Sequence, residues 1–376
     1  MRLRTLELEN FKNYAKLSVD LSGIDQLILV GNNAQGKTNF LEAIMVLALS
    51  RPHQSLALKD MVNWFVHERE TGLPEFLRIK GNVQSANVNN DLEVVCERKL
   101  RARKSLKVDG VVLKPHDYVG HLRAVMFTPQ DLNMVMLSPQ LRRRAINILI
   151  SQIDREYLRS LSQYQLVLKQ RNRLLEHLRD GQGDTTQLDY WDDVVADHGA
   201  LLLWKRREIF HQLNASLAKH YESISSTAVN FQLSWKRHWQ GVDFREMRAV
   251  FSDYLRSKRA RDIETGKTCG GPHRDDFVFL MNDRDLALSG SRGECRSAVL
   301  ALKLAECSLI KSITGESPVL LFDDVFSELD PTRQRNLLQL FDVDQVIITT
   351  THLDFSPEKA VVWRVEGGEI ASLGSQ

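Results

Sequence analysis

The chain has 376 residues, 43% of them hydrophobic and 26% charged, and its 50 lysines and arginines nearly balance 48 aspartates and glutamates. This composition is typical of a globular protein with a full core and two domains or lobes, and it excludes a disordered or strongly basic chain. The longest apolar runs are too short to cross a bilayer and the first residues lack a signal-peptide core, so we expect a cytoplasmic protein that binds no membrane.

The pattern of apolar residues divides the chain into three regions. Up to about Pro129, short apolar strands alternate with turn signals, as in Leu3 to Leu8 and Leu27 to Val30. From about residue 130 to residue 267, apolar residues recur at helical spacing, with charges between them. From about Thr268 strands return, with one helix between them.

The strongest chemical signal is the run Gly31-Asn32-Asn33-Ala34-Gln35-Gly36-Lys37-Thr38, which fits the pattern G-x-x-x-x-G-K-[ST]. It follows an apolar strand and precedes a helical run, which is the context that a phosphate-binding loop requires. The backbone N–H groups of such a loop and the positive end of the following helix bind phosphates. We therefore expect ATP here, with Lys37 on the β- and γ-phosphates and Thr38 on Mg²⁺.

A second signal supplies the expected metal ligand. The apolar run Val319 to Phe322 predicts a buried parallel strand, and Asp323 and Asp324 stand at its carboxyl end, where α/β sheets place ligand chemistry. Asp323 would hold Mg²⁺, and Asp324 would orient or deprotonate the attacking water.

Other short motifs are similar to those of ABC ATPases. Gln130 has the place of the Q-loop glutamine, which implies contact with Mg²⁺ and a role in hydrolysis, and His352 resembles the catalytic switch histidine. The run Ser327 to Asp330 resembles the D-loop. The signature motif has two possible registers: Leu288-Ser289-Gly290 matches its beginning literally, whereas Ser291 to Glu294 matches Ser-Gly-Gly-Glu with one substitution.

The order of these motifs, together with longer segments, resembles the RecF family of DNA-repair proteins. The segments that carry the resemblance are Leu8 to Tyr14, Phe127 to Leu132, Ser138 to Arg144, Gly271 to Asp276, Leu300 to Glu306 and Leu320 to Asp330. The spacing of that family favours the second register and places the signature on Ser291 and Gly293.

The resemblance implies an α/β ABC-type P-loop ATPase head with an inserted, mainly helical lobe. Lobe I would comprise residues 1–129 and 312–376, and lobe II, with the signature, residues 130–311. It further implies an ATP-dependent homodimer on double-stranded and gapped DNA, slow DNA-dependent hydrolysis that times release, and assistance to RecA loading with RecR and RecO.

Two departures from the family pattern stand at the expected nucleotide site. Ala34 occupies a position where relatives usually carry glycine, and alanine would cost about 1 kcal/mol if φ there is positive. Arg292 and Glu294 stand where many relatives carry glutamine, so we expect the contacts of the signature to differ in strength.

Support for DNA binding from the residues alone is modest. Basic residues gather in four clusters: Arg98 to Lys107, Arg142 to Arg144, Lys205 to Arg207, and Arg256 to Arg261. In the first, Arg101, Arg103 and Lys107 would share one face of a strand. Two alternatives from other classes remain open: the ATP-binding subunit of a transporter and a structural ATP clamp that does not hydrolyse. An SMC protein is excluded, because the chain has no room for long coiled-coil arms.

Overall fold

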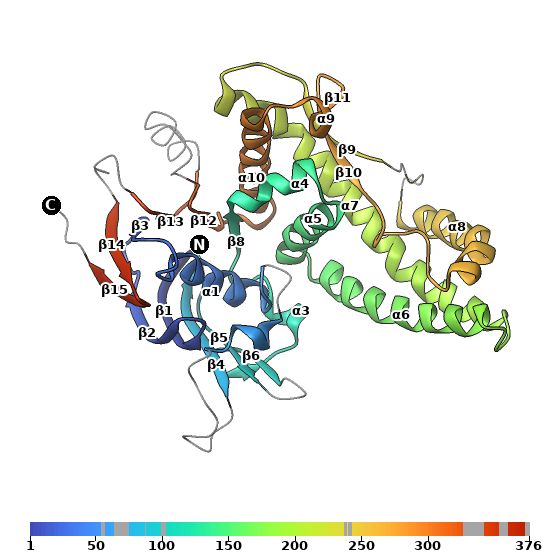
Figure 1. Cartoon of the computed structure of the whole chain (residues 1–376), viewed down its shortest axis with the longest axis horizontal. Coiled ribbons are helices and arrows are strands. Elements are labelled where there is room, and N and C mark those ends of the chain that lie inside the picture. Colours follow the sequence, from blue (N-terminus) through green and yellow to red (C-terminus); the bar gives the residue numbers. More distant parts are fainter. Residues whose placement is uncertain are drawn as a thin grey trace. The chain divides into compact units, whose positions relative to one another are not determined.

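The computed structural model describes residues 1–53, 57–63, 75–86, 88–98, 103–236, 239, 243–325, 342–352 and 360–372. The chain forms two compact units (Figure 1): unit 1 consists of Met1–Asp131 and Leu302–Gln376, and unit 2 of Leu132–Ala301. The second boundary lies inside α10 (Arg292–Thr314). Because a boundary within a continuous helix has no turn or loop signal, the sequence gives no local mark of it, and our expected boundary at 311/312 lies elsewhere in that helix.

Unit 1 contains a mainly parallel sheet in the order β15-β14-β3-β13-β12-β8. Its strands are β3 (Gln26–Val30), β8 (Ala124–Phe127), β12 (Val319–Asp323), β13 (Val346–Thr350), β14 (Val361–Glu366) and β15 (Glu369–Ser372). All neighbours from β14 to β8 are parallel, whereas β15 is antiparallel to β14. β12 and β13 are buried along their whole lengths, which is typical of central parallel strands.

A second sheet of unit 1 is antiparallel, in the order β2-β1-β4-β5-β6-β7. Its strands are β1 (Arg2–Phe11), β2 (Tyr14–Asp20), β4 (Phe76–Gln84), β5 (Asn89–Glu97), β6 (Lys104–Val108) and β7 (Val111–Val112). Buried and half-buried residues alternate along β4 and β5, as expected where only one face of a sheet is covered. Asp109 and Gly110 form the turn between β6 and β7, both with positive φ.

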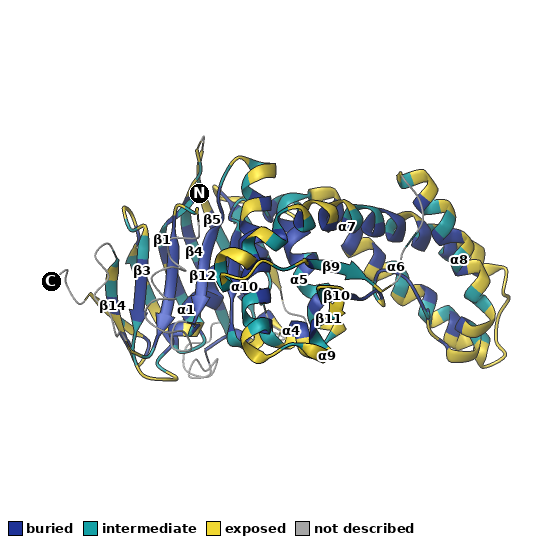
Figure 2. Cartoon of the chain, turned by 90° about the horizontal axis from the view of Figure 1, so that it is seen from above, coloured by how far each residue is buried: buried dark blue, intermediate teal, exposed yellow. Residues whose placement is uncertain are grey.

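Helix α1 (Lys37–Leu49) packs against strands of both sheets. Nearly all of its residues are buried, as Figure 2 shows, because a helix that is apolar all round must be covered on every side. The short elements of unit 1 are η1 (Leu58–Met61), α3 (Pro115–Tyr118) and η2 (Pro129–Asp131). Because α1 packs against strands of both sheets, it also fixes the position of the loop that precedes it, residues 31–36.

Unit 2 is mainly helical. Its helices are α4 (Leu132–Met136), α5 (Pro139–Ile153), α6 (Arg155–Arg179), α7 (Gln187–Ser225), α8 (Phe244–Thr265), α9 (Leu286–Ser289) and the first part of α10. The long helix α7 packs against α6 and α8 through apolar residues at helical spacing, which the sequence predicted. A small antiparallel sheet, β9 (Phe231–Trp235), β10 (Phe277–Met281) and β11 (Arg284–Asp285), completes the unit. The helical periodicity did not predict β9, because five residues are too few for a clear alternating pattern.

The core of unit 2 also contains a charged cluster. Arg171, on α6, donates to Asp192 of α7 (2.7 Å), to Asp262 of α8 (2.8 Å) and to the hydroxyl of Thr268 (2.7 Å). Arg171, Asp192 and Asp262 are all at most 1% exposed. Because a buried charge is tolerated only with such partners, the cluster fixes how these three helices pack.

The described helices include none that is both long and apolar enough to cross a membrane.

Candidate nucleotide-binding site

Residues 31–36 connect β3 to α1 and form a loop whose glycines are required by close contacts. A Cβ atom on Gly31 would lie 2.3 Å from the carbonyl oxygen of Val365, and one on Gly36 would lie 2.6 Å from the side-chain amide of Asn13. Gly36 also has a φ of 117° at the N-cap of α1. These two glycines therefore allow the loop to pass close to the backbone of β14 and to the side chain of Asn13.

Three side chains from outside the loop hold it in place. The amide of Asn13 donates to the carbonyl of Gln35 (3.0 Å) and the hydroxyl of Tyr14 donates to that of Gly36 (3.0 Å). Asn39 in turn donates to Asn13 (2.7 Å). Sequence reasoning assigned no role to these residues, although Asn13 and Tyr14 stand in the opening segment that carries the family resemblance. The loop is thus preorganised with its N–H groups available.

The ammonium group of Lys37 lies inside this loop. Its Nζ donates to the carbonyls of Gly31 (2.5 Å) and Asn32 (2.8 Å). Burial lowers the pKa of Lys37, and the charges of Asp324 and Asp323 act in the opposite direction. A buried ammonium that is held by two carbonyls is well placed to bind phosphate oxygens instead.

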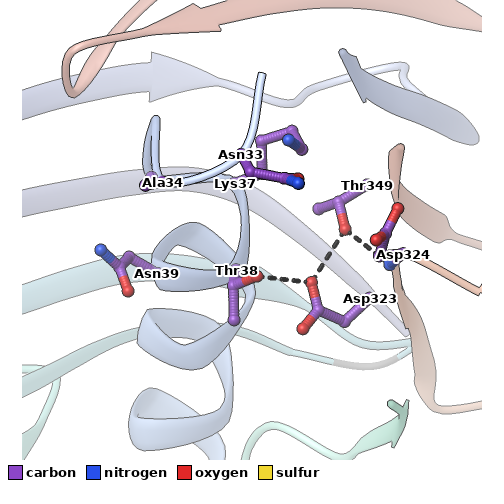
Figure 3. A pocket seen from close by; sticks show the side chains of 9 residues that line it. Asn33, Ala34, Lys37, Thr38, Asn39, Asp323, Asp324 and Thr349 are labelled. Carbon is purple, nitrogen blue, oxygen red and sulfur yellow. Dashed lines mark hydrogen bonds between the residues drawn. The ribbon is translucent and has the colours of Figure 1, made fainter. Parts of the chain in front are cut away.

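Asp323, the last residue of β12, lies beside the beginning of α1 and the end of β13. It accepts hydrogen bonds from Thr38 (2.8 Å) and from Thr349 of β13 (2.9 Å), as Figure 3 shows. Burial raises the pKa of Asp323, the two hydrogen bonds lower it, and nearby Asp324 and Glu42 raise it. Because a carboxylate and a hydroxyl oxygen are oxygen ligands that Mg²⁺ prefers, this pair fits the expected metal.

Asp324 lies beside Asp323 in an unusual backbone conformation. Its φ is 51°, in the left-handed region, and its N–H donates to the hydroxyl of Thr349 (3.0 Å). Thr349 therefore contacts both acidic residues at once. Its role was not expected from the sequence, because it depends on the parallel pairing of β12 and β13, in which Asp323 stands opposite Thr349.

The loop and the two strand ends enclose a cavity of about 120 Å³ within unit 1. It is lined by Asn33, Ala34, Gly36, Lys37, Thr38, Asn39, Asp323, Asp324 and Thr349 (Figure 3). The structure thus brings the two strongest sequence signals into one site, although they lie far apart along the chain.

Ala34 has a φ of 65°, in the left-handed region. This is the condition under which we expected alanine to carry a cost of about 1 kcal/mol relative to glycine. The strained residue lines the cavity directly.

The remaining expected site residues of unit 1 do not line this cavity. Gln130 lies in η2 after the end of β8 and is exposed, and His352 follows β13 and is also exposed. The carbonyl of His352 accepts a hydrogen bond from the hydroxyl of Thr350 (2.8 Å). The D-loop segment Ser327 to Asp330 lies outside the described residues.

The expected signature residues Ser291 and Gly293 belong to unit 2 and are exposed at the beginning of α10. Glu294 donates its N–H to the Ser291 hydroxyl (3.2 Å), so Ser291 is the N-cap of the helix. Ser289, of the other register, instead lies at the end of α9, and its hydroxyl donates to the carbonyl of Asp285 (3.0 Å). This arrangement supports the register that begins at Ser291.

Four cations in the basic clusters of unit 2 form ion pairs with acidic residues of that unit. The ion pairs are Arg142 with Asp276, Lys205 with Asp154, Arg256 with Asp193 and Arg259 with Asp192. Arg206 is buried and donates to Tyr157, Asn147 and the carbonyl of Pro272. These side chains stabilise unit 2 and are poor candidates for binding phosphates.

In the basic cluster of unit 1, Arg98 to Lys107, some of the described cations already have hydrogen-bond or ion-pair partners. Lys107 pairs with Glu93 (2.7 Å) and Lys104 donates to the carbonyl of Ser50 (3.0 Å). Arg103 is exposed, and its side chain makes no ion pair or hydrogen bond with a described residue. Lys99 and Arg101 lie outside the described residues.

Comparisons with known proteins agree with this fold. The family described as "RecF/RecN/SMC N terminal domain" matches residues 2–367. The chain is 37% identical over 360 residues to DNA replication and repair protein RecF of Bacillus cereus (strain G9842), covering 94% of this chain and 93% of that one. RecF of Latilactobacillus sakei gives the same values.

Solved structures show the same relationship. The structure described as the recombination mediator protein RecF-ATPrS in the RecFOR pathway has a TM-score of 0.89 and 29% identity, and covers 99% of this chain and 98% of that chain. An SMC head bound to a domain of ScpA has a TM-score of 0.55 at 14% identity over 99% of this chain and 98% of that chain, which shows the fold alone. The predicted α/β ABC-type head fold is therefore confirmed, and this chain belongs to the RecF family of DNA replication and repair proteins.

Proposed function

We propose that the chain binds ATP and Mg²⁺ in the cavity of unit 1 and uses them as a switch for dimerisation on DNA. The observation that carries this proposal is the hydrogen-bonded set Thr38, Asp323 and Thr349 beside the buried Lys37. Relatives solved as RecF-ATP and RecF-ATPrS favour the same nucleotide for this chain.

Each residue of the site has a distinct role in this proposal. The N–H groups of residues 31–36 and Lys37 would bind the phosphates, and Thr38 and Asp323 would hold Mg²⁺. Gln130, which is exposed and does not line the cavity in this structure, would join them only after moving toward it. The metal, when bound, neutralises phosphate charge and compensates the buried carboxylate of Asp323. Asp324 and Gln130 orient water for hydrolysis, and His352 contacts the γ-phosphate.

The proposed switch requires two copies of the chain. We assign nucleotide binding to unit 1 and the signature, Ser291 and Gly293, to unit 2. In the ABC-type arrangement, the signature of one copy contacts the nucleotide that the other copy holds. ATP that binds the dimer better than the monomer then drives head-to-tail dimerisation, and hydrolysis reverses it.

On DNA, the dimer would act at double-stranded and gapped sites. One solved relative is described as a recombination mediator in the RecFOR pathway, which supports a role with RecR and RecO in loading RecA, with slow hydrolysis that times release. Binding would be directed at phosphates without sequence readout. We assign this contact to exposed Arg103, which precedes β6 in the basic cluster Arg98 to Lys107.

The test is binding to gapped, duplex and single-stranded DNA, with and without ATP, for wild type and Lys37→Ala. We expect Lys37→Ala to lose ATP binding, ATP-dependent dimerisation and the ATP-dependent part of DNA binding. Lys16→Ala, at an exposed position on β2, is the control and should behave as wild type. Unchanged ATP affinity in Lys37→Ala would refute the assignment of the site.

The alternative that stays open is an ATP clamp that does not hydrolyse. It is favoured by Asp324, which is shorter than the glutamate usual in ABC ATPases and has a strained φ of 51°. Comparison of Asp324→Asn with wild type decides between them. If Asp324 is catalytic, the variant binds ATP, accumulates dimer and loses hydrolysis; if both proteins form stable dimers without measurable phosphate release, the clamp is correct.

A further inference from the structure

The beginning of α10 carries a reciprocal pair of hydrogen bonds. The N–H of Ser291 donates to the carboxylate of Glu294 (2.7 Å), and the N–H of Glu294 donates to the hydroxyl of Ser291 (3.2 Å). This is a capping box, in which the side chain of the third helical residue returns to the N-cap. The Ser291 side chain also interacts with the Glu294 carboxylate, so the capping box holds the hydroxyl and the carboxylate together at this helix end.

Two residues of opposite charge lie close to this hydroxyl in the chain: Arg292, whose side chain has no partner among the described residues, and Glu294, whose side chain is hydrogen-bonded. Arg292 is exposed and makes no hydrogen bond or ion pair through its side chain with any described residue. Glu294 is held against the backbone, and within the described part of the chain no cation lies within 4.0 Å of its carboxylate. The hydrogen bonds from Ser291 lower the pKa of Glu294, so it is ionised at neutral pH.

We infer that Arg292 and Glu294 set, with opposite signs, the affinity of this helix end for the triphosphate bound to a second copy of the chain. The inference rests on the proposed two-copy site. The positive end of α10 attracts an anion, and the free guanidinium one residue after Ser291 adds to that attraction. The carboxylate of Glu294 already occupies the same end of the helix and repels the incoming phosphates.

Substituting glutamine for Arg292 or for Glu294 removes the charge of the side chain while keeping the beginning of α10 intact. Glutamine at 294 can accept the same bond from the Ser291 N–H, so the capping box survives while its negative charge is removed. Glutamine at 292 keeps a side chain of similar helix propensity and removes the positive charge. Both variants should therefore melt at the wild-type temperature.

The experiment measures the dissociation constant of the ATP-dependent dimer by sedimentation at low and at high salt. We expect Arg292→Gln to weaken the dimer and Glu294→Gln to strengthen it, each by about three- to thirtyfold, because each dimer contains two such helix ends. The double variant should return close to wild type. Added salt should shrink all of these differences.

Matched controls remove the same charges from α8 in the same unit. Arg261→Gln and Glu264→Gln, both exposed, should leave the dimer unchanged. ATP affinity of the monomer should be the same in all variants, since its binding loop is untouched. Wild-type dimerisation with no effect of Arg292→Gln or Glu294→Gln, or effects of the same sign, would overturn this inference alone. A wild-type protein that never dimerises with ATP would overturn the proposed two-copy site and this inference with it.

Discussion

The hydroxyl of Thr38 donates a 2.8 Å hydrogen bond to the carboxylate of Asp323, although the two residues are 285 positions apart in the chain. Thr349 donates to the same carboxylate oxygen from β13, which lies between β12 and β3, the strand that leads into the loop before Thr38. The proposed metal ligands are therefore positioned by one strand that contributes no ligand of its own.

Replacing Thr349 by valine should weaken ATP binding that depends on Mg²⁺. The variant keeps the shape of the side chain but removes one hydrogen bond to Asp323 and one acceptor for the N–H of Asp324. Since a hydrogen bond to a charged group contributes about 1.5–3 kcal/mol, we expect a loss of at least about tenfold. Calorimetry with Mg²⁺ and with a chelator measures it. Thr314→Val, which alters hydrogen bonds at the end of α10 instead, is the control; equal losses in both variants would contradict the role of Thr349.

Replacing Ala34 by glycine should stabilise unit 1. The φ of 65° strains alanine and is unstrained for glycine, so we expect a gain of about 1 kcal/mol in the free energy of unfolding. Urea unfolding tests this. Ala43→Gly in the middle of α1, where φ is helical, should instead destabilise by a similar amount, about 0.5–1 kcal/mol. A loss of stability in Ala34→Gly would show that the left-handed conformation carries no strain there.

Ser291→Arg should block ATP-dependent dimerisation while leaving ATP binding by the monomer nearly intact, because a bulky cation would have to enter a closed interface. Mixing it with Lys37→Ala should restore part of the dimer and of the ATPase activity. In the mixed dimer, one composite site pairs an intact loop with an intact signature. Sedimentation and phosphate release of the mixture measure this.

If the signature acts on the nucleotide of its own copy, the mixture of the two variants regains neither dimer nor ATPase activity. If Ser289→Arg complements Lys37→Ala and Ser291→Arg does not, the signature begins at the other register. The capping role of Ser291 means that melting of Ser291→Arg must be measured alongside.

Arg103→Gln should weaken DNA binding more than Lys107→Gln does. Arg103 is exposed and has no partner among the described residues, whereas Lys107 is already compensated by Glu93. We expect Arg103→Gln to reduce the slope of log affinity against log salt by about one, and Lys107→Gln to change it less. Binding to duplexes of different sequence should weaken equally. A wild-type slope in Arg103→Gln would place the DNA contact elsewhere.

Acid should destabilise unit 2 through His273. Its Nε2 donates to the carbonyl of Thr268 (3.1 Å), so in the neutral ring Nδ1 accepts from the hydroxyl of Tyr164 (2.7 Å). Burial lowers the pKa of His273 to about 4, below its ordinary value of about 6.5 in the unfolded chain.

Between these two values the unfolded state binds the proton more readily, so stability falls as the pH drops from about 6.5 to about 4, by at most about 3 kcal/mol. Above that window His273 makes no pH-dependent contribution. Urea unfolding near about pH 7 and about pH 5 should show a smaller difference for His273→Asn than for wild type. The exposed His211→Asn should keep the wild-type difference.

Features that depend on neighbours along the chain could be predicted from the order of the residues. The loop from Gly31 to Thr38 was predictable because the strand, the glycines and the helix that give it its shape are contiguous. Asp323 and Asp324 were predictable because an apolar strand that ends in carboxylates has its chemistry at that end. The α/β fold class followed from the family resemblance and was confirmed.

Only the tertiary structure decided which distant side chains meet these features. Asn13 and Tyr14 reach the loop because β1 and β2 lie beside it, and Thr349 reaches Asp323 because β13 pairs with β12 in one particular register. The basic clusters also show what the sequence could not predict. Arg142 and Arg259 stand among other cations in the sequence. In the fold they pair with Asp276 and Asp192, both more than sixty residues away. Charge and hydrogen-bonding capacity are local properties of a residue, but whether they are already satisfied depends on contacts that the fold alone creates.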